Sequence, residues 1–192
     1  MANIQPNGRS ELHHCRRIVV KVGTRLITKD DSLLNTRFLD QVAQQMAVLR
    51  ERGPEVNGEI VTDARGGDFE FIIVTSGAIF LGRRVLGISH SKDSLPIRQA
   101  AAAAGQPRLM HIWSEALHAR GLRSGQMLLT LDDMSERGRY LNVRNTIETL
   151  MENDVIPVIN ENDSVSVEGI TFEENDRLAA MVASTAQAEL AI

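Results

Sequence analysis

The chain has 192 residues, of which 43% are hydrophobic and 24% charged, and its formal net charge is −4. This composition is typical of a folded globular protein and excludes an intrinsically disordered chain. The weak negative charge argues against nucleic acid or a membrane surface as the main partner. No apolar run approaches the roughly 18 residues that span a bilayer. The one cysteine, Cys15, predicts a reducing, cytoplasmic setting.

The first half of the chain predicts two strand–helix units after a flexible tail over residues 1–15. A β-branched run at 17–23 predicts a buried strand, and the helix after it is capped by Asn35 or Thr36 and ends near residue 53. Residues 54–69 are rich in glycine and charge, which predicts an inserted loop or small hairpin. Residues 70–75 predict a second strand that turns directly into a helix at residue 78.

The second half repeats this alternation. Ser94 and Pro96 begin an alanine-rich helix that reaches Ala104, restarts after Gly105 and continues to Leu117. The remaining elements are strands at 126–131, 155–160 and 188–192, helices at 135–153 and 175–187, and a short hairpin at 165–172. Repeated strand–helix units imply an α/β fold with a mainly parallel sheet and helices on both faces.

Candidate functional residues follow the strands, where ligands collect in open α/β sheets. Lys21 is a cation in an apolar strand, and Gly23 would let a phosphate approach the backbone, although an edge lysine that reaches solvent remains the alternative. Ser76 and Gly77 stand at a strand-to-helix turn whose free N–H groups favour a carboxylate or phosphate, or serve only as a helix cap.

Two polar clusters complete this set. Residues 160–163 (Asn-Glu-Asn-Asp) lie at the end of the fourth strand, and residues 175–176 (Asn-Asp) open a helix. Their amides and carboxylates could hold an ammonium group or position cationic side chains, and either cluster alone could be turn chemistry. The chain lacks a Walker-type phosphate loop, a dinucleotide fingerprint and a nucleophile elbow. His13 and His14 lie in the tail, and His90, His111 and His118 lack ligand spacing, so no metal site is predicted.

Five motifs in order resemble the glutamate 5-kinases of the amino-acid kinase family, from about residue 16 to the end. They are 18–24 (IVVKVGT), 73–79 (IVTSGAI), 104–106 (AGQ), 125–130 (GQMLLT) and 157–163 (PVINEND). The resemblance implies a three-layer α/β/α sandwich, with residues 16–192 as the N-terminal part of the kinase domain. We expect this fold to be truncated at its C-terminus, without the family's C-terminal ATP-binding half and PUA domain.

The resemblance also implies the chemistry, which is transfer of the γ-phosphoryl group of ATP, with Mg²⁺, to the side-chain carboxylate of L-glutamate. The product leads to proline, which would be a feedback inhibitor, and the enzyme would be a homo-oligomer, a dimer or tetramer. The implied ATP phosphate contacts are Lys21, Gly23 and Thr24; the implied catalytic residues are Lys21 and Asp176, which orients it; and the implied glutamate contacts are Ser76, Gly77, Asn160, Asp163 and Asn175.

Two alternatives stay open at this point. One is a truncated, non-catalytic chain that binds glutamate or proline, and the other is an amino-acid kinase that acts on aspartate, acetylglutamate or carbamate.

Overall fold

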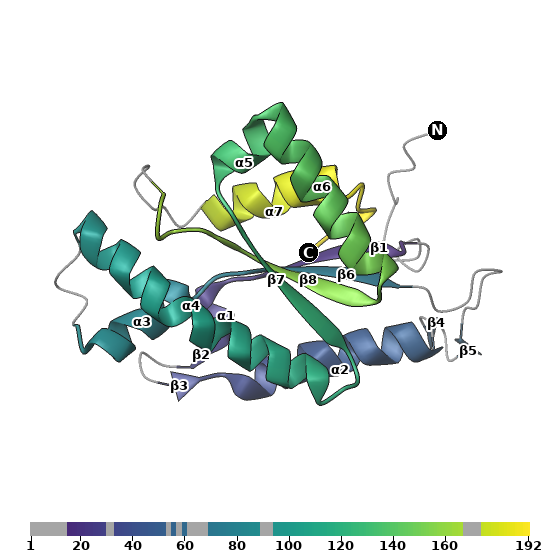
Figure 1. Ribbon diagram of the computed structural model, residues 1–192. Helices are drawn as coiled ribbons and strands as arrows, with labels where there is room; N and C mark the ends of the chain where they lie inside the picture. Colours follow the sequence, from purple (N-terminus) through teal and green to yellow (C-terminus); the bar gives the residue numbers. More distant parts are fainter. Residues whose placement is uncertain are drawn as a thin grey trace.

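A computed structural model describes residues 15–29, 33–52, 55–56, 59–60, 69–88, 94–166 and 174–192. Most of the expected tail, including His13 and His14, lies outside these residues, as do His90 and most of the hairpin expected at 165–172. The described parts of the chain form a central sheet with helices above and below it (Figure 1).

The sheet has five strands in the order β7-β8-β6-β1-β9, and every neighbouring pair is parallel. The strands are β1 (Arg17–Val22), β6 (Glu70–Thr75), β7 (Arg123–Leu129), β8 (Val155–Glu161) and β9 (Leu190–Ala191). In β6 and β8 every residue after the first is buried, which is typical of parallel strands that helices cover on both faces. The prediction of a mainly parallel sheet is confirmed.

Helices cover both faces of this sheet. One face carries α2 (Thr36–Arg52), α3 (Ala78–Leu86) and α4 (Leu95–His118), and the other carries α5 (Leu131–Ser135), α6 (Arg137–Glu152) and α7 (Glu174–Thr185) (Figure 1). Strand β6 shows why two cores form. Phe71 and Ile73 pack with α2 and α4, whereas Ile72 and Val74 pack with α6 and α7, because successive side chains point to opposite faces. The predicted α/β/α sandwich is confirmed.

Short elements connect these layers. They are α1 (Thr24–Ile27) and two antiparallel pairs, β2 (Thr28–Lys29) with β3 (Leu33–Leu34) and β4 (Glu55–Val56) with β5 (Glu59–Ile60). The second pair lies in the segment 54–69, whose remaining residues except Phe69 lie outside the described set. None of the helices in the described ranges is both long and apolar enough to cross a membrane.

The expected restart of the alanine-rich helix is wrong. Helix α4 is continuous from Leu95 to His118 and contains both Gly105 and Pro107. Gly105 is buried where α4 crosses α3, and Leu109, Trp113 and Leu117 on the same helix are fully buried in the core. Tertiary packing therefore outweighs the low helix propensity of glycine and proline.

The helix expected at 135–153 is confirmed as α6, but the strand before it ends earlier than expected because a short helix, α5, follows it. Thr130 and Asp133 form a capping box that ends β7 at Leu129 and begins α5. The carboxylate of Glu136 then accepts hydrogen bonds from the N–H groups of Gly138 and Arg139, which begins α6. Each cap supplies acceptors to N–H groups that have no partner within their helix.

Candidate functional site

The predicted site residues lie where β1, β6 and β8 end. These three strands are neighbours in the sheet, so their carboxyl ends meet at one edge. Helix α7 packs on β1, β6 and β8 and begins at the same edge. The fold therefore brings together the four groups of polar residues that the sequence places far apart.

Lys21 in β1 forms an ion pair with Asp176 in the first turn of α7, and its Nζ lies 2.6 Å from Asp176 Oδ1. The side chains are 30% and 60% exposed, and an ion pair this accessible to water adds little stability. Its main effect is to fix the direction of the lysine side chain. The carboxylate of Asp176 is also favourably placed near the positive end of the helix dipole.

Gly23 and Thr24 follow this lysine directly. Gly23 has ordinary extended dihedral angles, so its backbone conformation does not require glycine. A Cβ at this position would lie only 3.3 Å from Lys21 Nζ, however, and a larger side chain would cover the ammonium group. Thr24 begins α1 beside it. The absence of a side chain at Gly23 therefore leaves space for an anion at Lys21.

Ser76 and Gly77 form the turn between β6 and α3. Gly77 has φ of 114°, a conformation that L side chains rarely adopt. The side-chain amide of Asn175 donates from Nδ2 to Ser76 Oγ over 2.8 Å, across 99 residues of sequence. Since Ser76 Oγ accepts this bond, its own O–H remains available to donate. Asn175 Oδ1 is buried and has no hydrogen-bond partner.

The third group lies at the end of β8. Asn160, Glu161 and Asp163 are 2%, 4% and 7% exposed, which is rare for such polar residues. Asn160 Nδ2 donates to Gln106 Oε1 on α4 over 2.9 Å, whereas Asn160 Oδ1 is buried without a partner. A buried acceptor in this state costs about 1–3 kcal/mol until a donor reaches it. Both Asn160 and Asn175 thus hold a buried carbonyl oxygen that accepts no hydrogen bond.

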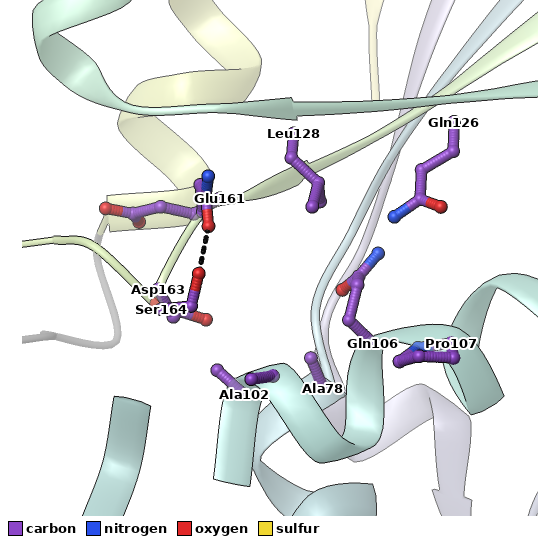
Figure 2. Close-up of a pocket in the computed structure, with 11 residues that line it drawn as sticks. Ala78, Ala102, Gln106, Pro107, Gln126, Leu128, Glu161, Asp163 and Ser164 are labelled. Atoms are coloured by element: carbon purple, nitrogen blue, oxygen red, sulfur yellow. Dashed lines mark hydrogen bonds between the residues drawn. The ribbon is translucent and has the colours of Figure 1, made fainter. Parts of the chain in front are cut away.

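A cavity of about 270 Å³ adjoins this group. Figure 2 shows Gln106 of α4 and Gln126 of β7 on one side of it, with Asp163 and Ser164 from the loop after β8 on another. The lining residues are Ala78, Ala102, Ala103, Gln106, Pro107, Gln126, Leu128, Glu161, Asn162, Asp163 and Ser164. Of the residues implied to contact ATP or glutamate, only Asp163 lines this cavity, together with its neighbours Glu161 and Asn162 from the predicted cluster at 160–163.

Sequence reasoning missed Gln106 and Gln126 as site residues. Each lies inside a regular element, where a glutamine has no local mark of function. The only available signal was that both belong to short motifs shared with the resembling family. His111 and His118 are exposed on α4, as expected for surface residues. The described residues contain no cluster of three or more histidine, cysteine, aspartate or glutamate side chains that could hold a metal ion.

Residues 16–192 match the amino acid kinase family. The chain belongs to this family. A solved structure with the same fold is the UMP kinase from Ureaplasma parvum, with a TM-score of 0.55 over 92% of this chain and 67% of that one. Its sequence identity is 13%, so this likeness concerns the fold alone.

Several curated relatives of this amino acid kinase chain carry the name glutamate 5-kinase. The relative from Geobacter metallireducens is 43% identical over 94% of this chain, and that from Syntrophus aciditrophicus is 41% identical over 97%. Glutamate 5-kinase 1 from Mesorhizobium japonicum is 45% identical over 92%. The chain spans 44%, 44% and 43% of the lengths of these three relatives.

Proposed function

We propose that this chain forms the N-terminal part of a glutamate 5-kinase, which transfers the γ-phosphoryl group of ATP to the side-chain carboxylate of L-glutamate. The observation that carries the proposal is the sheet edge at which Lys21, held by Asp176, lies near the polar ends of β6 and β8. Identity of 41–45% to relatives named glutamate 5-kinase supports the same reaction.

Lys21 would neutralise charge on the phosphates of ATP. Its Nζ is held by Asp176, and the missing side chain at Gly23 leaves room for an anion beside it. Thr24, the next residue, would line the same space. Phosphoryl transfer depends mainly on alignment and charge stabilisation, so a fixed cation at this point is the main contribution of β1.

The ends of β6 and β8 and the start of α7 would bind glutamate. The Ser76 hydroxyl and the N–H at Gly77 are donors suited to a carboxylate, since the Ser76 oxygen already accepts from Asn175. Asp163 would pair with the α-ammonium group, and the free carbonyl oxygens of Asn160 and Asn175 would accept from it or from other donors of the ligand.

This arrangement needs no general base. A glutamate side chain has a pKa of about 4.3 and is already ionised at neutral pH. One carboxylate oxygen would attack the γ-phosphorus in line, forming the new P–O bond while the bond to the β-phosphate oxygen breaks and ADP leaves. Magnesium bound to the nucleotide would supply further charge neutralisation. Since Mg²⁺ at such sites is bound largely through substrate phosphates, the ATP phosphates would hold it.

The biological setting follows from the same proposal. The product, L-glutamyl 5-phosphate, would enter proline synthesis, with proline as feedback inhibitor of a homo-oligomeric enzyme. A cytoplasmic location fits the single cysteine, which is free and buried.

A panel of acceptors tests the proposal. The full-length protein that carries this chain is incubated with MgATP and hydroxylamine, and the hydroxamate of each acyl phosphate is measured for L-glutamate, L-aspartate and N-acetyl-L-glutamate. Carbamate is followed by ADP release. We expect turnover of L-glutamate and rejection of N-acetyl-L-glutamate, because acetylation removes the ammonium group that Asp163 would bind. A preference for any other acceptor would overturn the proposal, and binding without turnover would favour a non-catalytic glutamate-binding protein.

A further inference from the structure

Gln106 is a polar side chain at the cavity to which the proposed reaction assigns no role. It lies on α4, where that helix crosses α3 at unusually short range. A Cβ added at Gly105 would lie 1.9 Å from the carbonyl oxygen of Ala78, and one at Gly82 would lie 1.6 Å from that of Ala101. The two backbones are therefore in direct contact, and this crossing places Gln106 at a fixed distance from the turn after β6.

The contact that Gln106 makes determines how the Asn160 amide is oriented. Gln106 Oε1 accepts from Asn160 Nδ2 over 2.9 Å, and Asn160 is 2% exposed. An amide group can rotate to exchange its donor and acceptor ends. Because Gln106 engages the NH₂ group, the carbonyl oxygen of Asn160 remains as the free acceptor, and it has no other partner.

We propose that Gln106 is a positioning residue that orients Asn160 so that its carbonyl oxygen receives an N–H donor of the acceptor substrate, the α-ammonium group. This inference rests on the proposed function. Asp163 lines the same cavity as Gln106 and is 7% exposed (Figure 2). A carboxylate and a neutral acceptor would then face one ammonium group, and discrimination between an amino acid and its deaminated analogue would depend on Gln106.

The test compares L-glutamate with glutarate, which has both carboxylates but no ammonium group. The selectivity is the inhibition constant of glutarate divided by the KM of L-glutamate, measured in the full-length protein. Gln106→Met keeps the length of the side chain and removes the acceptor. We expect it to lower the selectivity about tenfold, the effect of one buried hydrogen bond, with the KM of ATP unchanged. Gln106→Glu keeps an acceptor for Asn160 Nδ2 and should preserve the selectivity.

Gln99→Met is the matched control. Gln99 is on the same helix and donates from Nε2 to the carbonyl oxygen of Ser166 over 3.1 Å, so it also ties α4 to the segment after β8. Its loss should leave the selectivity unchanged. If Gln106→Met does not fold, Gln106→Asn, which withdraws the amide by one methylene, carries the same expectation.

The outcomes separate the inference from the proposed function. A wild-type protein that does not phosphorylate L-glutamate overturns both. A wild-type protein that does, combined with a Gln106→Met variant of unchanged selectivity, overturns the inference alone. The same holds if Gln106→Met weakens L-glutamate and glutarate equally, or if Gln99→Met lowers the selectivity as much, because either result indicates a purely structural role.

Discussion

The crossing of α3 and α4 gives a stability prediction whose size follows from the geometry. In Gly105→Ala the new Cβ would lie 1.9 Å from Ala78 O and 2.4 Å from Gly82 N, both backbone atoms that cannot rotate away. The helices must separate by roughly 1 Å before this contact becomes tolerable, and overpacking of this kind costs about 3 kcal/mol, the upper end of the usual range. The higher helix propensity of alanine offsets about 1 kcal/mol of this cost. The free energy of unfolding of Gly105→Ala should therefore be lower than that of the wild type by about 2 kcal/mol.

Thermal and urea unfolding measure this loss. For a domain of this size, about 2 kcal/mol lowers the unfolding temperature by about 4–8 °C. The KM of L-glutamate should also rise, because separation of the helices displaces Gln106. Gly138→Ala is the control, since its Cβ would meet the Glu136 carboxylate at 3.2 Å, a contact that a small shift of that side chain relieves, and its stability should fall far less than that of Gly105→Ala. A Gly105→Ala protein as stable as the wild type would refute the reasoning.

Three further predictions concern single side chains. Partial burial acts to raise the pKa of the Asp133 carboxyl, but hydrogen bonds lower it below its ordinary 3.8. The stability that the ionised Asp133 carboxylate contributes is therefore complete above pH 3.8 and is lost as the pH falls through the lowered pKa. In Asp133→Asn, the free energy of unfolding measured in urea should decrease less as the pH is lowered. The same decrease as in the wild type would contradict this. Burial and a nearby carboxylate raise the pKa of the Cys15 thiol, so native protein should react with iodoacetamide more slowly than denatured protein, and equal rates would contradict it. Asp176→Asn should lower kcat more than it raises the KM of L-glutamate, because it acts through Lys21; a change confined to KM would contradict it.

The sequence predicted the layers of the fold because the apolar runs and helical patterns are local signals. Strand β6 occupies residues 70–75 as predicted, and α2 begins at Thr36, where the Asn35 side chain accepts from the N–H of Phe38. The continuity of α4 could not be predicted in this way. Gly105 packs closely against Ala78 within this helix, and this contact between residues distant in sequence is not visible in the local pattern.

The candidate site was likewise predicted only where its residues have a local signal in the sequence. Lys21 and Asp176 were singled out by polar character at strand and helix ends, and the structure joins them at 2.6 Å. Gln106 was not singled out as a site residue, because a glutamine within a helix has no local mark of function. Its partner Asn160 lies 54 residues away, and only the packing of α4 against the sheet brings the two amides together.

The most direct test of the central claim compares wild-type protein with Lys21→Met in ATP-dependent formation of glutamyl hydroxamate. Methionine keeps the length of the lysine side chain and removes its charge. If the end of β1 supplies the cation for phosphoryl transfer, saturating L-glutamate and MgATP should give robust turnover in the wild type and a kcat lower by about 10²–10³ in the variant. A Lys21→Met protein with wild-type kcat would contradict the account.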